Sequence, residues 1–210
     1  MNLRKLREAE EAFLRRYPGG FNNSEIIAIR NRKHKPDQMI ALAQESFSKG
    51  NFRLPEQIVR NMEKVIRHSS IVSVFEKLRF KDFINELPPQ NRDLLASSLE
   101  ELLHRHEETG FKTILDLLKG GNLAKWTLMT VCQTYFHPQR DVFIKPTTVK
   151  GVIEYFELEN LHYRPMPSWA FYEAYRFAFL EMKSKVHPSL APTNPAFSGF
   201  LLMSIHRRFF

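Results

Sequence analysis

The sequence predicts an all-α globular protein of about ten helices. Three observations support this fold class. Apolar residues recur at intervals of three and four over nearly the whole chain, which is the spacing of helices with one buried face. Capping residues and prolines stand where these periodic segments start, and glycines or prolines stand where they end. Strict alternation of apolar and polar residues, which is typical of strands, is not sustained anywhere, and the chain contains no internal repeat.

The first half of the chain divides into helices at its prolines, glycines and capping residues. The segment Pro18-Gly19-Gly20 ends the first helix, Ser24 caps the second, and Pro36 takes a first-turn position of the third. Gly50 is the expected residue just after the end of that third helix. The expected helices cover about 3–17, 24–33, 36–49, 55–67, 70–87 and 90–106.

The second half follows the same rules. Its first two helices are apolar-rich and are joined by Gly120-Gly121-Asn122. Thr147 or Thr148 caps the next helix, and Ser168 caps a long aromatic one. The expected helices cover about 111–119, 123–136, 147–158, 168–185 and 196–206.

The chain combines many aromatic residues with a positive charge. It has 26 aromatics (18 Phe, 6 Tyr and 2 Trp) and a formal net charge of +8, which favours nucleic acid first and an anionic membrane surface second. Residues 120–210 hold 17 of the aromatics but only 16 charged residues, whereas residues 1–119 hold 38 charged residues. We therefore expect an N-terminal helical lobe over 1–109 and an aromatic-rich lobe over 110–210, or one continuous domain.

Several functional classes lack their sequence signatures. The single cysteine, Cys132, lies in an apolar stretch and is expected in the core, which favours a reducing, cytoplasmic location. The charged amino terminus has no apolar segment typical of a secretory signal, and no segment has the apolar length of a membrane span. The common phosphate-loop, dinucleotide, zinc-protease, nucleophile-elbow and Cys-x-x-Cys motifs are missing. We expect no cofactor, no metal and no membrane partner.

The segment from Leu115 to Val131, LDLLKGGNLAKWTLMTV, carries the clearest binding signal. Two apolar helices joined by a glycine turn expose backbone N–H groups at the start of the second helix, where the helix dipole favours an anion. Alternatively, the stem of Lys125 lies along aromatic surface with its ammonium group in water. The candidate phosphate contacts here are Lys119, Gly120, Gly121, Asn122 and Lys125.

Residues 110–160 resemble the helix-hairpin-helix DNA glycosylases. The family pattern is Leu-Pro-Gly-(apolar)-Gly-x-x-(Ser/Thr)-Ala followed by an apolar helix, and its hairpin amides hold the DNA backbone. The resemblance implies that Lys125 is the lysine that attacks the sugar in lyase-competent members and that Asp141 is the aspartate beyond the helix. Two departures imply altered or lost chemistry: the two glycines are adjacent, and Lys145 is nearer than Asp141 to the expected aspartate position. Whether the chain is a glycosylase or lyase therefore stays open.

Two further groups of cations are candidate phosphate contacts. Arg140, Lys145 and Lys150 surround the loop and helix start after the hairpin, where Phe143 and Tyr135 offer stacking surfaces for unpaired bases. Alternatively, the aromatic residues anchor the loop and the cations are solvated. The secondary basic patch consists of Arg30, Arg32, Lys33 and Lys35, with His34 among them. Its alternative role is to complement the dipole at a helix C-terminus.

Aromatic residues offer either a ligand pocket or a core. The candidate pocket residues are Trp126, Phe143, Trp169 and Tyr172. Aromatic residues at helical spacing more commonly form the core, where Trp and Tyr find hydrogen-bond partners. The segment 195–210 is apolar on nearly every face, so it forms either a central helix or half of a homodimer interface that includes Phe209 and Phe210.

These observations lead to three functional hypotheses. The first is nucleic-acid binding, with DNA favoured, through the hairpin and the cations from Lys125 to Lys150, on a glycosylase-like fold with altered or lost chemistry and a role in DNA repair. The alternative is a helical interaction or scaffold protein that self-associates through its aromatic C-terminal lobe. The third, active base excision, requires Lys125 and Asp141 to meet in one cleft.

Overall fold

The computed structural model describes residues 1–206, and this part of the chain contains eleven α-helices and no strand. The predicted all-α fold is confirmed. The first six helices are α1 (Leu3–Arg16), α2 (Ser24–Lys33), α3 (Pro36–Ser46), α4 (Pro55–His68), α5 (Val74–Glu86) and α6 (Pro89–His104). The other five are α7 (Glu107–Gly120), α8 (Trp126–Phe136), α9 (Pro146–Tyr155), α10 (Trp169–Ser184) and α11 (Asn194–Ile205). Among residues 1–206, no helix is both long enough and apolar enough to cross a membrane.

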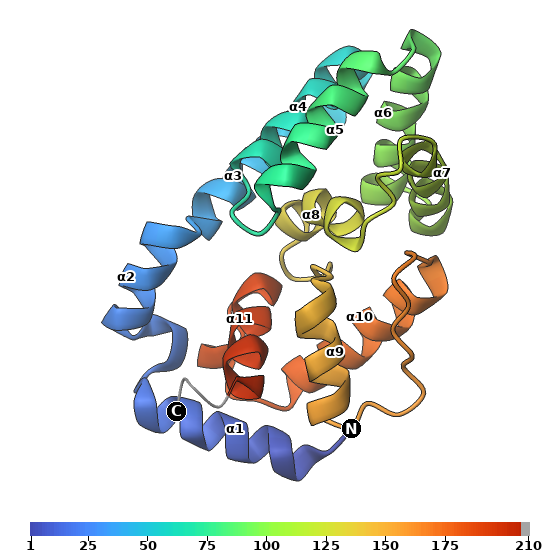
Figure 1. Ribbon diagram of the computed structural model, residues 1–210. Helices are drawn as coiled ribbons and strands as arrows, with labels where there is room; N and C mark the ends of the chain where they lie inside the picture. Colours follow the sequence, from blue (N-terminus) through green and yellow to red (C-terminus); the bar gives the residue numbers. More distant parts are fainter. Residues whose placement is uncertain (207–210) are drawn as a thin grey trace.

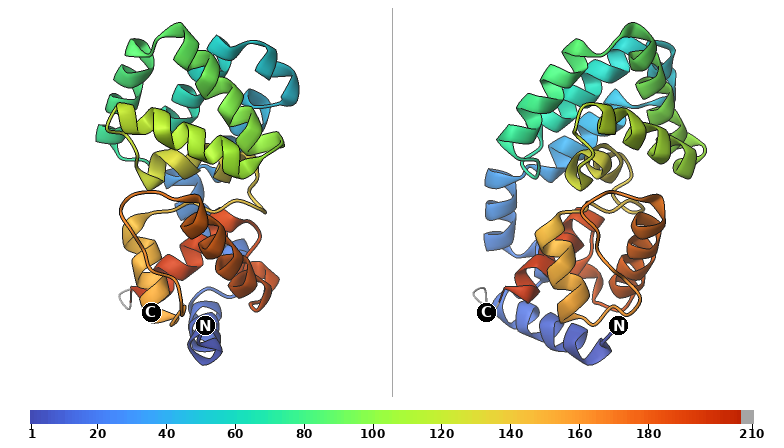
Figure 2. Two further views of the ribbon diagram at one scale, coloured as in Figure 1. Left: turned by 90° about the vertical axis from the view of Figure 1, so that its right-hand side faces the viewer. Right: turned by 45° about the vertical axis from the view of Figure 1, so that its right-hand side comes forward.

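The helices pack as two groups (Figure 1), and we call the region where the two groups meet the waist. The upper group contains α3 to α8, the lower group contains α1, α9, α10 and α11, and α2 runs between them; the rotated views in Figure 2 show the same division. The N-terminal helix therefore belongs with the C-terminal helices: the N–H of Asn2 donates to the carbonyl of Phe156 (2.8 Å), and α1 packs on α11. The predicted boundary between residues 109 and 110 falls inside α7, which packs on α6. Separate folding of two lobes stays a prediction.

The C-terminal helix α11 is the centre of the lower group. Phe197 and Phe200 of α11 are fully buried, and Phe200 packs edge-on against Phe13 of α1 with 5.4 Å between the ring centroids. The sequence left two roles open for residues 195–210, a central helix or half of a homodimer interface, and this arrangement is that of a central helix. Phe209 and Phe210, which the sequence placed in the homodimer alternative, lie outside the described residues.

Helices α6 and α7 approach each other very closely at Gly110. A Cβ atom on Gly110 would stand 2.3 Å from the backbone nitrogen of Leu102 and 2.4 Å from the carbonyl oxygen of Ser98. Any side chain at this position would therefore push the two helices apart. Because α7 leads into the hairpin, the contact at Gly110 also sets where the hairpin lies.

Two predicted helix ends in the first third of the chain need correction. Asn23, rather than Ser24, caps α2, because the Asn23 side chain accepts a hydrogen bond from the N–H of Glu25 (3.0 Å). Helix α3 ends at Ser46, so Gly50 is not the residue that follows its end; Gly50 lies inside a short 3₁₀ helix, Lys49–Arg53.

Helix α5 starts at Val74, later than the predicted start near residue 70. The Ser73 hydroxyl accepts a hydrogen bond from the N–H of Glu76 (3.2 Å), and the Glu76 carboxylate accepts one from the N–H of Ser73 (3.1 Å). This capping box fixes the start of the helix. Residues 69–73 consequently form a loop between α4 and α5, and this loop lies at the waist.

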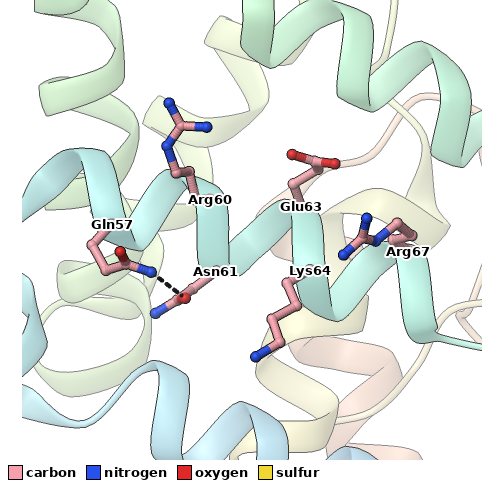
Figure 3. A pocket seen from close by; sticks show the side chains of 6 residues that line it. All are labelled: Gln57, Arg60, Asn61, Glu63, Lys64 and Arg67. Atoms are coloured by element: carbon pink, nitrogen blue, oxygen red, sulfur yellow. Dashed lines mark hydrogen bonds between the residues drawn. The ribbon is translucent and has the colours of Figure 1, made fainter.

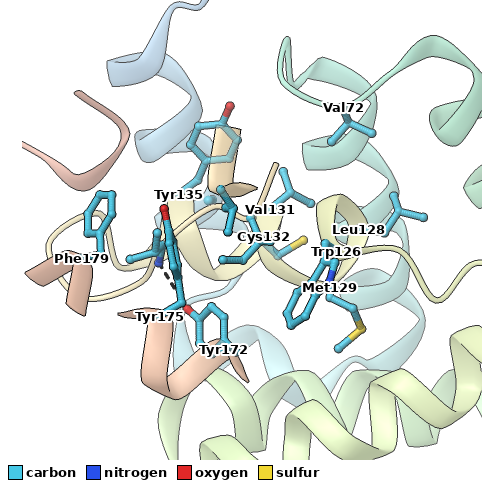
Figure 4. Close-up of a cluster of buried hydrophobic side chains, with 14 of the residues drawn as sticks. Val72, Trp126, Leu128, Met129, Val131, Cys132, Tyr135, Tyr172, Tyr175 and Phe179 are labelled. Carbon is cyan, nitrogen blue, oxygen red and sulfur yellow. Dashed lines mark hydrogen bonds between the residues drawn. The ribbon is translucent and has the colours of Figure 1, made fainter. Parts of the chain in front are cut away.

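Cys132 is a core residue, as the sequence predicts. It lies on α8 among buried side chains that include Val131 and Met129 (Figure 4). Burial raises the pKa of its thiol to about 12, so the thiol is protonated at neutral pH.

Candidate nucleic-acid interface

The hairpin between α7 and α8 is closed by a helix-ending motif in which Asn122, not a glycine, has a left-handed backbone (φ 53°). The N–H of Leu123 donates to the carbonyl of Leu118 (2.7 Å), as in a Schellman motif. Gly121 has a negative φ of −91°, so the turn does not need it for its conformation. A glycine is required at position 121 because there is no room for a side chain: a Cβ atom there would stand 2.5 Å from the ring of Phe83.

The start of α8 already has a protein carboxylate beside it. The helix begins at Trp126, and its N-cap residue Lys125 provides no side-chain cap. The hydroxyl of Thr127 donates to one carboxylate oxygen of Glu76, whose other oxygen accepts a hydrogen bond from the hydroxyl of Ser73 (2.7 Å). A negative charge therefore lies at the first turn of α8, where the helix dipole favours it and where the sequence predicts a phosphate.

Two cations lie at the surface of the turn without a carboxylate partner in the described chain. Lys125 is exposed, and its ammonium group forms no hydrogen bond or ion pair within residues 1–206. Arg79 of α5 donates from Nη2 to the carbonyl of Gly121 (3.5 Å), and tertiary packing alone brings it there. We call Arg79 and Lys125 the turn cluster. Lys119 is also exposed but pairs with Asp116 (2.9 Å).

A second cationic group lies at the waist, where two predicted basic segments meet. Nδ1 of His34 lies 2.8 Å from the hydroxyl oxygen of Ser70. Partial burial lowers the pKa of His34, and the positive charges of Lys33 and Lys145 lower it further. The charge of Lys145, which is far from His34 in the sequence, therefore acts on His34 through space. We call Lys33, His34 and Lys145 the waist cluster.

The remaining residues of the secondary basic patch have other surroundings. Arg30 forms an ion pair with Asp37 (2.5 Å) that joins α2 to α3. Arg32 and Lys35 are exposed. Lys35 has a left-handed backbone (φ 43°) at the turn into α3, a conformation that is costly for a residue with a side chain.

Lys145 and Lys150 have different surroundings. Lys145 is the N-cap of α9, which starts at Pro146, so neither Thr147 nor Thr148 caps this helix as predicted. Lys150 lies over the ring of Tyr163, 5.1 Å from its centroid, and so contacts the loop between α9 and α10 rather than the waist cluster.

Arg140 and Asp141 belong to a partly buried ion-pair network. The Asp141 side chain is fully buried; one of its oxygens accepts from Arg140 (2.9 Å), and the other accepts from the hydroxyl of Tyr172 (3.0 Å) and from Arg176 (2.9 Å). Glu107 of α7 accepts from Arg176 (2.5 Å) and pairs with Arg140 (3.2 Å). Burial and the nearby carboxylate raise the pKa of Tyr172, so its hydroxyl remains a donor. The network ties α7, α10 and the loop before α9 together.

Lys125 and Asp141 lie at opposite ends of α8. The helix has 11 residues, so it is roughly 16 Å long. Asp141 follows its C-terminal end, where its N–H donates to the carbonyl of His137 (2.9 Å). Lys125 is exposed, whereas Asp141 is buried. The structure does not bring the predicted nucleophile and the predicted acid to a shared opening.

Three of the four candidate pocket aromatics are core residues. Trp126, Trp169 and Tyr172 are buried around Phe111, with ring centroids 5.6 to 6.4 Å from its own. Figure 4 shows Trp126 and Tyr172 within the buried cluster around α8. Phe143 is half-buried in the loop before α9. These three buried rings fit the alternative that the sequence left open, in which the aromatic residues form the core and not a ligand pocket.

A surface pocket of about 250 Å³ lies along α4 (Figure 3). None of the predicted site residues lines it. Two hydrogen bonds hold its polar side chains in place: the Gln57 amide donates to Asn61 (2.8 Å), and the Asn61 amide donates to the carbonyl of Ser46 (2.9 Å). The lining residues are Gln57, Arg60, Asn61, Glu63, Lys64 and Arg67. The helical spacing of the three cations is the sequence signal that could have indicated this surface.

Fold and surface together define a class: an all-helical protein with two groups of helices, a partly buried ion-pair network between them and exposed cationic clusters at the waist and at the hairpin. Comparison with protein-family models, with curated proteins and with solved structures finds no match for this chain. The helix-hairpin-helix resemblance therefore rests on the sequence segment that carries it. Within residues 1–206, no group of three or more His, Cys, Asp or Glu side chains is placed to hold a metal ion.

Proposed function

We propose that this protein binds nucleic acid, with DNA as the favoured form, through the waist cluster and the turn cluster. The distribution of charge supports this proposal. Between residues 117 and 153 the chain has one carboxylate, Asp141, and five Lys or Arg side chains, for a local charge of 5 − 1 = +4. Arg140 pairs with Asp141 and Glu107, and Lys119 pairs with Asp116, so Lys125, Lys145 and Lys150 are the three of these cations that form no ion pair within residues 1–206. The five cations are Lys119, Lys125, Arg140, Lys145 and Lys150.

The observation that carries the proposal is that cations from distant parts of the chain act on one exposed site: His34 lies 2.8 Å from Ser70, and the charges of the exposed Lys33 and Lys145 both act on its ring. Like charges repel, and neither lysine forms an ion pair within the described residues. A fold that gathers such charges gains from an anionic ligand that neutralises them. The nucleic-acid backbone, with regularly spaced phosphates, is such a ligand.

Salt-dependent binding tests the proposal. The affinity for a short fluorescently labelled DNA duplex is measured by anisotropy over roughly 50 to 200 mM salt, where phosphate contacts give a steep loss of affinity. The double variant Lys33→Gln/Lys145→Gln should bind more weakly, with the slope of log affinity against log salt reduced by about 1 to 2.

The matched control removes two charges elsewhere. Arg4→Gln/Lys112→Gln removes two exposed cations that pair with Glu8 and Glu108 and lie outside both clusters. It should bind as the wild type does. Equal affinities for the cluster variant and the control, or binding that ignores salt, would contradict the proposal.

The helix-hairpin-helix resemblance adds DNA repair as the process that this binding serves. The positions of Lys125 and Asp141 at opposite ends of α8 support altered or lost chemistry rather than the family's usual pairing of the two groups. Self-association through the C-terminal lobe is the alternative function. Light scattering of the full chain at increasing concentration tests it, and a mass that rises with concentration would favour it.

A further inference from the structure

The first turns of α5 carry an exposed apolar surface. Val74, Phe75 and Leu78 are 72%, 68% and 57% exposed. They lie on one side of the helix, because residues three and four positions apart are neighbours on a helix. Contiguous exposed apolar side chains add little to the core and mark binding surfaces. We call these three residues the α5 patch.

The turn cluster borders the α5 patch on one side. The guanidinium group of Arg79 lies over the ring of Phe75, 5.8 Å from its centroid, and also donates to the carbonyl of Gly121. Glu76, the acidic residue within this stretch of α5, accepts a hydrogen bond from Thr127 at the start of α8. Its carboxylate is therefore engaged in that hydrogen bond. One turn after Leu78, the exposed Lys81 and Asp82 offset each other, so the positive charge beside the patch comes from Arg79.

The waist cluster contacts the loop that leads into the α5 patch. Ser70, which is hydrogen-bonded to His34 (2.8 Å), belongs to the loop 69–73 that leads directly into Val74. Figure 1 shows this loop at the waist, between α3 and α8. The α5 patch thus has Arg79 over its aromatic ring, and the loop that leads into it contacts the waist cluster.

We propose that the α5 patch stacks on unpaired bases of a nucleic acid whose phosphates are held by the two clusters, so that the protein binds a single strand more tightly than an intact duplex. This inference rests on the proposed function. Charge complementarity selects the occupant, because an apolar surface with a guanidinium group over its ring and a cationic cluster at the adjoining loop fits a polyanion that has apolar faces. A single strand offers phosphates to the cations and base rings to Phe75, whereas the bases of a duplex are stacked on each other.

A tryptophan at position 75 gives a direct readout of stacking. Trp126 and Trp169 are 1% and 8% exposed, so the indole introduced by Phe75→Trp is the water-exposed one. A single strand of oligo(dT) should quench and shift its emission, because a base that stacks on the ring displaces water. The oligo(dT)–oligo(dA) duplex at the same phosphate concentration should have little effect. Unchanged emission at a saturating concentration of the single strand would overturn the inference.

Affinity measurements distinguish failure of this inference from failure of the proposed function. Phe75→Ala should weaken single-strand binding about tenfold and leave duplex binding unchanged. Phe177→Ala is the matched control, because Phe177 is an exposed phenylalanine (73%) on α10 in the lower group, and it should bind as the wild type does. Suppose that Phe75→Ala binds the single strand as tightly as the wild type does, while Lys33→Gln/Lys145→Gln still binds more weakly. This result would overturn the stacking inference and leave the proposed function standing.

Two other results would also overturn the inference. If the wild type binds neither single strand nor duplex, the stacking inference and the proposed function fail together. If the wild type self-associates and Phe75→Ala makes it monomeric, the α5 patch is covered by a second copy of the chain instead of by bases.

Discussion

Arg176 of α10 and Glu107 of α7 form an ion pair with 2.5 Å between guanidinium nitrogen and carboxylate oxygen, and this pair links the two groups of helices. The same guanidinium group pairs with Asp141 (2.9 Å) and lies over the rings of Trp169 and Tyr172. One side chain therefore joins α7, α10 and the loop that leads to α9. Through that loop, the network helps to fix the position of the waist cluster.

Loss of the Arg176 side chain and its ion pairs should destabilise the protein. We expect Arg176→Met to lower the free energy of unfolding by about 3 kcal/mol, because the buried carboxylate of Asp141 and the partly buried one of Glu107 keep their charges with fewer partners. Urea unfolding measures the change. In the control Lys112→Gln, loss of the exposed ion pair with Glu108 should change stability by less than about 1 kcal/mol. An Arg176→Met variant as stable as this control would contradict the structural role.

The close crossing of α6 and α7 predicts a strong effect of a single methyl group. Gly110→Ala should lower the free energy of unfolding by about 2 to 3 kcal/mol, because the new Cβ would overlap the backbone of α6. Gly120→Ala is the matched control: Gly120 ends the same helix and a Cβ there would meet nothing within 4 Å. It should be neutral or stabilising by up to about 1 kcal/mol. Equal urea midpoints for the two variants would contradict the packing argument.

His137 predicts a loss of stability at mildly acidic pH. Burial lowers its pKa below the ordinary value of 6.5, so the unfolded chain binds a proton at a higher pH than the folded protein does. As pH falls through that value, protonation therefore favours unfolding. The free energy of unfolding should fall between about pH 7.5 and 5.5. The His137→Gln variant should lose less stability over this pH range. The double variant His137→Gln/His34→Gln should lose even less, because the pKa of His34 is also lowered. Superimposable pH profiles for the three proteins would argue against this assignment.

Lys125 is the residue on which the lyase hypothesis depends. Borohydride traps the imine that a lysine forms with the sugar of an abasic site. Because Lys125 is exposed and Asp141 is buried at the other end of α8, we expect no trapped adduct with an abasic-site duplex. Gel electrophoresis after borohydride treatment checks this outcome. An adduct that disappears in Lys125→Ala would restore the catalytic hypothesis.

Local sequence determined the helical class and most helix positions. Periodicity, prolines and capping residues act within a few positions of the chain, so Pro36, Pro55 and Ser168 mark helix starts where the structure has them. Where two local signals compete, the prediction fails: Asn23 lies next to Ser24 and takes the cap. Phe75 shows a further limit, because a helical pattern does not tell which apolar positions a neighbouring helix covers.

The candidate site depended on tertiary structure. The sequence supplied Lys33, Lys125 and Lys145 as cations, but it could not show that the charges of Lys33 and Lys145 both act on His34 or that Arg79 reaches the hairpin turn. Nor could it show that Asp141 is buried in ion pairs. Electrostatic interaction and burial act through space, between helices that packing brings together from distant parts of the chain. The sequence thus determined which residue types and helices exist, whereas packing decided which charges remain exposed and which are neutralised.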